Sequence, residues 1–351
     1  MKKILILSPY DGFSHRFWRE SLAGYLGTKF IVVECVLPPR FFSWRHRGNS
    51  LSFSRKPELQ QSFDLIIATS MTDLSALRGL NRNLAMLPAV LYFHENQFAY
   101  PGVNNIGLLD RQITSVYSAL SAEKIVFNSE FNRTTFLNGV IQLLKKMPDE
   151  VPRDIVKCIE EASTIIPVPL DIEPVKWFRS PRERVRIVWN HRWEHDKGPA
   201  SLLEIVNELL KQKVDFEMSL LGQQFSLYPS EFDEILQLLR TNNRSGEIGF
   251  VEDRNEYLSI LASHHFVLST ADQEFQGLAI QEGIATGCIP VAPDCLCYPE
   301  YIPPEYRYSS PNEALNILNT QKGEGSPSQL LKRYLWPSVG SAWDALLAEV
   351  C

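Results

Sequence analysis

Hydrophobic positions along the chain form short apolar runs that alternate with longer stretches of helical spacing. Runs that predict strands occur in the first half at Lys3–Leu7, Phe30–Val36, Asp64–Ala68, Ala89–Phe93 and Lys124–Asn128, and in the second half at Val185–Asn190, Phe216–Leu221, Glu247–Phe250, Phe266–Ser269 and Ile289–Ala292. Helices are predicted at Phe17–Leu26, Leu108–Ser121, Glu130–Lys146, Pro199–Lys211, Ser230–Arg240, Arg254–Ala262 and Gly277–Thr286. Near-continuous apolar strands that alternate with helices are typical of an α/β fold with doubly wound parallel sheets.

The repetition of this scheme in both halves predicts two domains, which suits a chain of 351 residues. The boundary falls where Pro167, Pro169, Pro174 and Pro181 exclude regular structure. We expect a Rossmann-like domain at 1–165, a linker at 166–184, a second Rossmann-like domain at 185–334, and a C-terminal helix at 335–351 that packs back on the first domain. Two such domains facing one another would place the carboxyl ends of their strands around a central cleft, where ligands bind.

The composition excludes several classes of protein. Hydrophobic residues make up 44% of the chain, so it is a folded globular protein. The net charge of −6 means that a nucleic-acid partner would need a local basic patch. Six scattered cysteines without a CxxC pair favour a reducing cytoplasm. No apolar run approaches the roughly 18 residues of a membrane span. We therefore expect a cytoplasmic protein without membrane association.

The strongest motif begins after the strand expected at Phe266–Ser269, where Glu274 stands eight positions before Glu282. Gly277 lies between the two acids and opens a predicted helix. A helix N-terminus that follows glycine presents free N–H groups to an anion such as a diphosphate. The two carboxylates can accept hydrogen bonds from hydroxyls at opposite ends of one ligand. Two surface acids at a helix start are the simpler alternative, but Phe275, Gly277 and the downstream pattern from Gly287 to Val291 favour a site. Phe275, Gln276 and Leu278 are further candidates for donor binding.

A pair of cations follows the strand expected at Val185–Asn190. Arg192 and Lys197 are separated by four residues. Placed on a departing diphosphate, they would stabilise its charge without a metal. For an isolated pair of charges, the alternative is that both residues are ordinary charged groups on the protein surface. No convincing DxD-type metal motif occurs, so we expect no metal and no other cofactor.

Together these motifs resemble those of the retaining GT-B glycosyltransferases of the family-4 type. The resemblance implies that Glu274 binds the transferred sugar, Glu282 the nucleotide ribose, and Arg192 with Lys197 the diphosphate. It also implies that His94, after the strand expected at Ala89–Phe93, contacts hydroxyls of the reacting sugar. A helix cap or a buried hydrogen bond is the alternative for His94.

Other candidates follow strand ends. Gly12 comes after the first strand and permits close approach of a ligand, and Gly222 begins a loop that could select the donor base. Asn96, Asn128 and Ser129 are candidates for the acceptor side. For Asn128 and Ser129, an N-cap of the following helix is equally favoured.

Cations and aromatic residues interleave after the second strand, at Arg40, Phe42, Trp44, Arg45 and Arg47. Rings and guanidinium planes of this kind stack on single-stranded bases, and cations bind phosphates. The alternative is a solvated loop whose rings pack on the domain.

Seven segments, among them SHRFW, LYFHENQFAYP, VWNHRWEHDKGP and STADQEFQGLAIQEG, resemble a narrower family in the same order along nearly the whole chain. This family is the tRNA-queuosine α-mannosyltransferases, which transfer mannose from GDP-mannose to queuosine in the anticodon of aspartate tRNA. The resemblance implies a sugar nucleotide and tRNA as partners. Competing hypotheses are a related transferase with a lipid or polysaccharide acceptor, a non-catalytic RNA-binding protein on the same fold, and a sugar-nucleotide epimerase.

Overall fold

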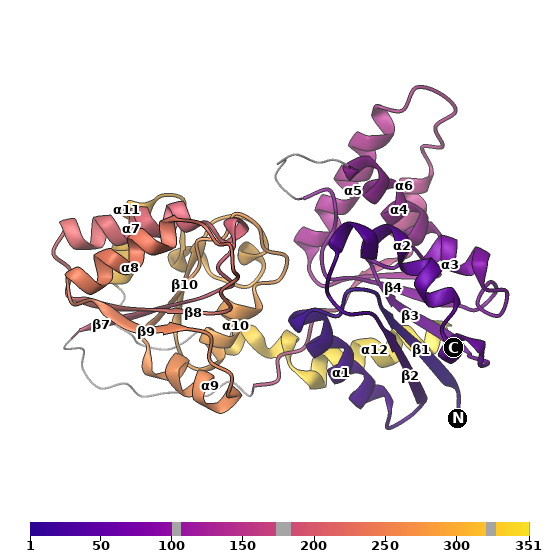
Figure 1. The fold of residues 1–351 in the computed structure, drawn as a ribbon, viewed down its shortest axis with the longest axis horizontal. Coiled ribbons are helices and arrows are strands. Elements are labelled where there is room, and N and C mark those ends of the chain that lie inside the picture. The colour runs from indigo at the N-terminus through magenta and orange to yellow at the C-terminus, as the bar shows by residue number, and fades with distance from the viewer. Residues whose placement is uncertain (100–106, 173–183, 321–327, 351) are drawn as a thin grey trace. The chain divides into compact units, whose positions relative to one another are not determined.

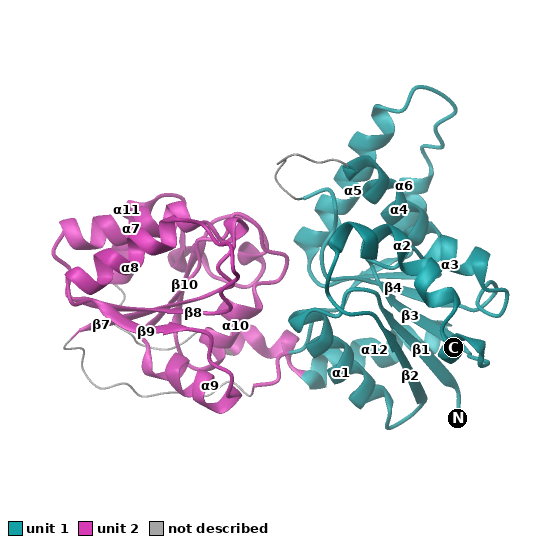
Figure 2. Cartoon of the chain, in the orientation of Figure 1, with its two compact units in different colours: residues 1–169, 336–351 teal, residues 170–335 magenta. Residues whose placement is uncertain are grey.

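The computed structural model describes residues 1–99, 107–172, 184–320 and 328–350. The chain divides into two compact units, coloured separately in Figure 2. Unit 1 comprises Met1–Pro169 with Trp336–Cys351, and unit 2 comprises Leu170–Leu335. The two chain crossings lie side by side, because the N–H of Leu170 donates to the carbonyl of Tyr334 and Leu170 bridges Leu335. Of the linker predicted at 166–184, residues 173–183 lie outside the described part of the chain.

Unit 1 contains a six-stranded parallel sheet in the order β2-β1-β3-β4-β5-β6 (Figure 1). Its strands are β1 (Lys3–Ser8), β2 (Ile31–Val36), β3 (Leu65–Thr69), β4 (Ala89–Phe93), β5 (Lys124–Phe127) and β6 (Ser163–Ile165). Its helices are α1 (Phe13–Leu26), α2 (Phe42–Ser54), α3 (Leu74–Leu80), α4 (Leu108–Leu120), α5 (Glu130–Lys145), α6 (Ile155–Glu161) and α12 (Trp336–Val350), with a 3₁₀ turn η1 (Pro57–Gln60). The order reverses between β1 and β3, as in doubly wound sheets.

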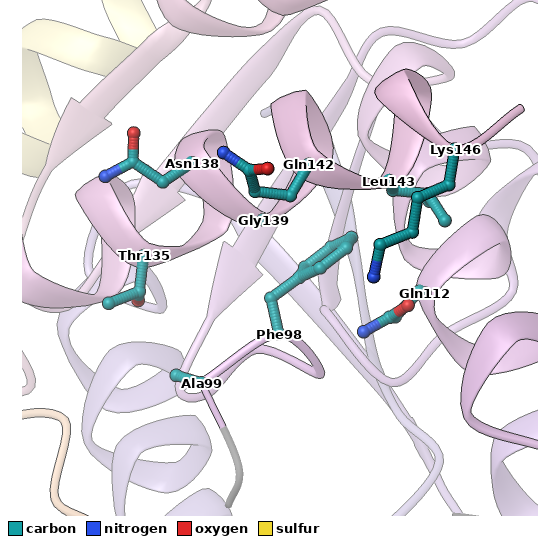
Figure 3. Close-up of a pocket in the computed structure, with 9 residues that line it drawn as sticks. All are labelled: Phe98, Ala99, Gln112, Thr135, Asn138, Gly139, Gln142, Leu143 and Lys146. Carbon is teal, nitrogen blue, oxygen red and sulfur yellow. The ribbon is translucent and has the colours of Figure 1, made fainter. Parts of the chain in front are cut away.

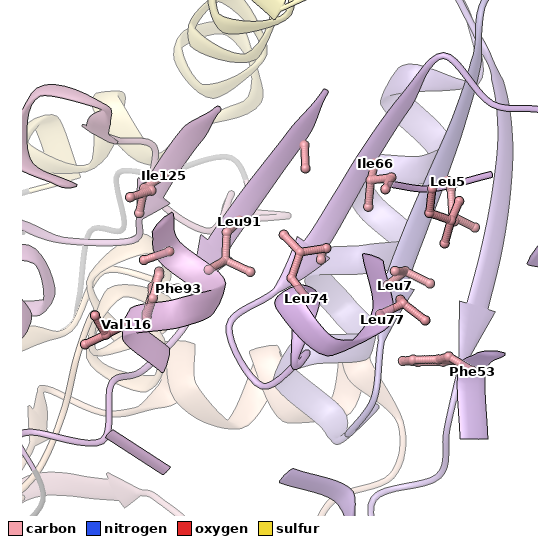
Figure 4. Packing of buried hydrophobic residues seen from close by; sticks show 14 of the residues in the cluster. Leu5, Leu7, Phe53, Ile66, Leu74, Leu77, Leu91, Phe93, Val116 and Ile125 are labelled. Atoms are coloured by element: carbon pink, nitrogen blue, oxygen red, sulfur yellow. The ribbon is translucent and has the colours of Figure 1, made fainter. Parts of the chain in front are cut away.

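One face of this sheet packs against α2, α3, α4 and α5. Alternate strand residues point to this face and form a core with the helices (Figure 4). Leu5 and Leu91 from the strands meet Phe53 of α2, Val116 of α4 and Phe136 of α5. Because these helices share one core, their outer surfaces belong to a single continuous layer.

The C-terminal helix α12 packs on unit 1. Trp343 is fully buried, and its ring lies 6.3 Å from that of Trp18 on α1 and 6.0 Å from that of Tyr92 on β4. The hydroxyl of Tyr25 donates to Asp344 at 2.8 Å. The last helix of the chain therefore completes the core of the first unit.

Unit 2 repeats the plan with the strand order β12-β11-β10-β7-β8-β9. Its strands are β7 (Val185–Asn190), β8 (Phe216–Leu221), β9 (Ser245–Gly249), β10 (Phe266–Leu268), β11 (Ile289–Pro293) and β12 (Arg307–Tyr308). Helices α7 (Pro199–Lys211), α8 (Glu231–Thr241) and α11 (Pro311–Thr320) cover one face, and α9 (Arg254–Ser263) and α10 (Leu278–Ala285) cover the other (Figure 1). Short 3₁₀ turns are η2 (His195–Lys197), η3 (Tyr298–Glu300), η4 (Pro304–Tyr306) and η5 (Ser328–Tyr334). The order reverses between β7 and β10.

The expected α/β fold is confirmed, and each strand and helix expected from the sequence is present, some with the expected bounds and the others with shifts at their ends. The sequence pattern missed α2, α3, α6 and α11 and the short edge strands β6 and β12. The segment Phe42–Ser54, interpreted from the sequence as a patch or a loop, forms a 13-residue helix. Its polar and apolar residues show no helical periodicity, and therefore the pattern gave no signal.

The docking of α12 can be tested by replacing Trp343 with alanine. We expect unit 1 to lose about 3–5 kcal/mol of stability, because a fully buried indole leaves a cavity between α1 and β4. Urea unfolding measures the change. Trp44→Ala removes the same side chain from a position that is 53% exposed and should cost far less. Equal losses in the two variants would contradict the docking role of Trp343.

Candidate active site

The motif residues of unit 2 gather at the carboxyl end of its sheet, where the strand order reverses. β7 ends at Asn190 and leads into the segment with Arg192 and Lys197, and β10 leads into the loop with Glu274. Gly198, with φ of +64°, joins the two loops, because a Cβ there would lie 1.8 Å from the carbonyl oxygen of Thr270. Only glycine permits this approach. The reversal point is where doubly wound sheets bind ligands.

Lys197 and Glu274 form a buried ion pair at this point. The Lys197 ammonium lies 3.4 Å from Glu274 and 3.0 Å from Asp196, and it donates to the carbonyl of Gln273 at 2.9 Å. Burial lowers the pKa of Lys197, but Glu274 and Asp196 outweigh it and the net shift is upward. The lysine is therefore charged, although only 7% of its surface is exposed.

The Glu274 carboxylate is held by its neighbours as an anion. Burial raises its pKa, whereas Lys197, His191 and the backbone N–H groups of Gly277 and Phe275 lower it, and the net shift is downward. An ionised carboxylate accepts hydrogen bonds only. Glu274 is therefore suited to bind hydroxyl donors such as those of a sugar.

Gly277 shapes the start of α10. Its φ is +78°, and an added Cβ would lie 2.4 Å from the hydroxyl oxygen of Tyr301. Of the neighbouring motif residues, Phe275 and Gln276 are buried and Leu278 is half-buried. The Gln276 amide donates to Gln281 at 3.1 Å. These side chains therefore hold the conformation of the loop.

Glu282 belongs to a second network. It accepts from the hydroxyl of Tyr257 at 2.8 Å and pairs with Arg254 at 2.6 Å. Tyr257 in turn accepts from the side-chain amide of Asn190 at 2.9 Å. Glu282 is thereby tied to the end of β7, close in sequence to Arg192. The two acids of the motif thus have separate partners on the same sheet edge.

Arg192 and Gly222 lie beside this cluster. The Arg192 side chain is 54% exposed and pairs with Glu194 at 2.9 Å. Gly222 follows β8 with φ of +122°, and a Cβ there would lie 2.0 Å from the carbonyl oxygen of His191. Gly222 is required by this packing. The structure therefore brings Arg192, Lys197, Glu274 and Glu282 to one edge of one sheet.

His191 is a residue that the sequence interpretation missed. It directly follows β7 and is 4% exposed, and its Nε2 has no hydrogen-bond partner in the described part of the chain. Burial, with Lys197 second, lowers its pKa to about 4. The imidazole is therefore uncharged near pH 7. The available signal in the sequence for a site residue was the position of His191 between the end of a predicted strand and Arg192.

In unit 1, His94 follows β4 in an aromatic cage. Its ring stacks on His15 at 4.3 Å and meets Trp18 edge-on at 4.8 Å. Burial, and secondarily His15, lower its pKa well below the ordinary range. Its Nε2 is buried without a partner among the described residues. The structure places a neutral imidazole at the carboxyl edge of this sheet.

The remaining acceptor-side candidates of unit 1 have structural roles. Asn96 is 1% exposed and donates to Asn132 at 2.8 Å while its oxygen accepts from Phe98. Asn128 donates to the carbonyl of His94 at 2.8 Å. The Ser129 hydroxyl caps α5. The polar atoms of these three side chains are buried and engaged in these hydrogen bonds, and their place on the acceptor side stays a prediction.

Gly12 precedes α1 as its N-cap residue. Its φ of −67° is open to any residue, and an added Cβ would meet its nearest neighbours at 3.9 Å. Neither backbone conformation nor packing requires glycine there. Close approach of a ligand to Gly12 stays a prediction.

The cation and aromatic segment divides into an exposed and a buried part. Phe42 and Trp44 on α2 are 39% and 53% exposed, and the Arg40 guanidinium lies over the ring of Phe41 at 5.8 Å. Arg47 pairs with Asp73 at 3.0 Å while 66% of its side chain stays exposed. Arg45 is buried, and its guanidinium donates to the carbonyl of Pro38 at 3.2 Å, so contact of this residue with RNA stays a prediction.

Neither a metal centre nor a membrane-spanning helix is found among the described residues. No three His, Cys, Asp or Glu side chains within them gather into a metal site. Nor does any helix among them have both the length and the apolarity to cross a bilayer.

Solved structures define the class of this protein. The chain matches *Anabaena* HepE in complex with UDP with a TM-score of 0.66 at 16% identity, covering 99% of this chain and 100% of that one. It matches sucrose-phosphate synthase from *Thermosynechococcus elongatus* with a TM-score of 0.71 at 12% identity, covering 99% and 100% of the two chains. The lipopolysaccharide outer core galactosyltransferase WaaB gives 0.63 at 12% identity, covering 99% of each chain. The fold is therefore GT-B, the two-domain fold of glycosyltransferases.

Sequence comparison defines the family. Residues 3–170 match the family model described as tRNA-queuosine alpha-mannosyltransferase N-terminal. The tRNA-queuosine alpha-mannosyltransferase of *Drosophila melanogaster* is 33% identical over 321 residues, which cover 88% of this chain and 84% of the relative. The chain belongs to the tRNA-queuosine α-mannosyltransferase family and is a glycosyltransferase.

The uncharged state of His191 predicts a pH dependence of stability. Its folded pKa of about 4 lies below the ordinary 6.5, so the unfolded chain binds a proton first as the pH falls. Unit 2 should lose about 2 kcal/mol from this residue between pH 7 and pH 5. Urea unfolding at each pH, followed by the fluorescence of the buried Trp189 and Trp193, measures this loss of stability.

His191→Gln should flatten this pH dependence. His195→Gln, at an exposed position in the same segment, controls for removal of an imidazole. An unchanged pH dependence in His191→Gln would show that His191 is not the group held neutral.

Proposed function

We propose that this protein transfers mannose from GDP-mannose, with retention of configuration, to queuosine in the anticodon of aspartate tRNA. The observation that carries the proposal is the Lys197–Glu274 pair at the sheet edge where β7 and β10 meet, in a chain of this family. The name of the *Drosophila* relative supports mannose as the sugar and tRNA queuosine as the acceptor. We further propose that the protein acts in the cytoplasm.

The proposed roles in donor binding follow from charge. Glu274 would accept hydrogen bonds from hydroxyls of the mannose, since its carboxylate is ionised. Arg192, whose side chain is 54% exposed, would take the diphosphate together with Lys197. Glu282 would accept from the ribose hydroxyls, held in place by Tyr257 and Arg254.

The cations would also serve the chemical step. Negative charge grows on the departing diphosphate as the bond to the sugar breaks, and fixed positive groups stabilise it. Lys197 already donates to three acceptors within the protein, so it would act on the diphosphate through its fixed positive charge. We propose that these residues do this work without a metal ion.

His94 is proposed to contact the reacting sugar. A neutral imidazole can donate or accept one hydrogen bond at Nε2, and a hydroxyl can provide either partner. The absence of a partner for Nε2 within the described chain supports this role.

For the acceptor we propose the exposed surface of α2. Phe42 and Trp44 would stack on unpaired bases of the anticodon loop, and Arg40 and Arg47 would contact phosphates. Because the net charge of the protein is −6, RNA would need a local binding surface. The exposure of both rings supports α2 as that surface.

The test is incubation with queuosine-containing tRNA and GDP-mannose, followed by mass spectrometry of the nucleosides. We expect one added hexose on queuosine, and at least a hundredfold lower rate in Glu274→Gln, because the amide replaces a charged acceptor in the transition state (about 3 kcal/mol). Glu256→Gln, on the outer part of α9, is the control.

UDP-glucose in place of GDP-mannose tests the donor, and a lipid extract in place of tRNA tests the alternative acceptor. Transfer to lipid but not to tRNA would overturn the proposed acceptor. Binding of tRNA without any transfer would favour a non-catalytic RNA-binding protein.

The α2 surface makes its own prediction. Trp44→Ala should raise the KM for tRNA about tenfold and leave the KM for GDP-mannose unchanged, because one stacked base contributes about 1–3 kcal/mol. Met86→Ala, which removes a 90% exposed side chain elsewhere on unit 1, is the control. An unchanged KM for tRNA in Trp44→Ala would exclude stacking on this ring.

A further inference from the structure

A cavity of about 380 Å³ opens between α4 and α5 in unit 1 (Figure 3). It reaches the size at which proteins hold small ligands. Phe98, four residues after His94, forms its floor, and Thr135, Asn138, Gln142 and Lys146 line one side. Nothing in the proposed roles of the motif residues uses this cavity.

The floor of the cavity is built by a glycine. A Cβ at Gly139 would lie 2.3 Å from the Phe98 ring, so the ring lies directly on the α5 backbone. Phe136 holds it from beneath in an edge-on contact at 5.4 Å. The ring is thus fixed and half-buried, and an aromatic ring held in this way is a stacking platform.

The walls carry neutral polar groups and one cation. Asn138 and Gln142 extend from α5 and Gln112 from α4. A carboxamide offers a donor and an acceptor side by side, which matches the edge of a nucleobase. Lys146 extends towards the middle of the cavity in Figure 3. Among the described residues, no acidic side chain lines the cavity, although acids outnumber bases in the chain.

The cavity is linked to the exposed surface of α2 through α4. Arg47 of α2 donates to Thr114 of α4 at 3.3 Å, two residues from Gln112. Both helices lie in the layer that covers the same sheet face as α5. An RNA strand that contacts both the α2 surface and the cavity would therefore cross α4.

We propose that this cavity binds one unstacked base of the tRNA, with the Phe98 ring against the base, the carboxamides on its edge and Lys146 on an adjacent phosphate. The inference rests on the proposed tRNA acceptor and adds a second contact to it. An aromatic platform, edge-reading amides and a single cation together fit a nucleotide of single-stranded RNA.

The test is filter binding of a queuosine-containing anticodon stem-loop to variants of the full chain. Phe98→Leu keeps the apolar packing on Gly139 and removes the ring, and it should weaken binding about tenfold. Gln142→Ala should weaken it several-fold, and it alters an exposed side chain that the fold does not need. The affinity of Lys146→Ala for the stem-loop is compared with that of Lys145→Ala, because Lys145 is an exposed neighbour outside the cavity.

Stem-loops with one abasic loop position each identify the bound base. Removing that base should weaken binding to the wild-type protein about tenfold and leave binding to Phe98→Leu unchanged, since the two changes remove one interaction. The proposal would be overturned if the losses of affinity from Phe98→Leu and from every abasic position were additive. Wild-type affinity in both Phe98→Leu and Gln142→Ala would also overturn it.

Binding is measured without a donor, so this result is separate from sugar transfer. Normal mannose transfer with no coupling at Phe98 would reject the cavity alone. Coupling at Phe98 without mannose transfer would reject the proposed reaction and retain the cavity.

Discussion

The burial of one ammonium group constrains the candidate active site. Lys197 is almost enclosed by protein, and an unpaired charge in such a place would cost several kcal/mol. Its partners are therefore obligatory: Asp196 from its own turn, and Glu274 with the carbonyl of Gln273 from the loop after β10. The pairing joins two strand ends that are about eighty residues apart in the sequence. It also keeps Glu274 ionised, so one interaction provides both a fixed cation and a fixed acceptor.

Close backbone packing makes this pairing possible. Gly198 lets the turn that carries Lys197 touch the backbone at Thr270, and Gly222 lets the loop after β8 touch the carbonyl of His191. A side chain at either position would overlap main-chain atoms, which cannot move aside as a flexible side chain can. The chemical groups are thus positioned by the reversal of strand order and by glycine. The same sheet reversal explains why ligand groups gather in this place in doubly wound folds.

The sequence predicted the fold, and it predicted that the candidate residues of unit 2 lie together, because both follow from local patterns. Buried strands appear in the sequence as apolar runs. The spacing of Glu274 and Glu282 is fixed because the start of one helix lies between them. The sequence could not predict α2, because Phe42–Ser54 has no apolar periodicity. It also could not show that Asn96 is engaged by Asn132, since that hydrogen bond joins elements that are distant in the chain. Exposed and buried polar residues look alike in a sequence.

The two buried histidines, His94 and His191, extend this argument. Each follows a strand at the carboxyl edge of its own sheet, and burial lowers the pKa of each. A buried polar nitrogen without a partner costs about 1–3 kcal/mol. The indole nitrogen of Trp343 is also without a hydrogen-bond partner in the described part of the chain. The ring of Trp343 fills the core, however, and its nitrogen is buried as a consequence of that packing. His191 lies instead beside the charges of Lys197, Glu274 and Arg192. A neutral imidazole there keeps one nitrogen able to donate or accept a hydrogen bond without adding to the positive charge of Lys197.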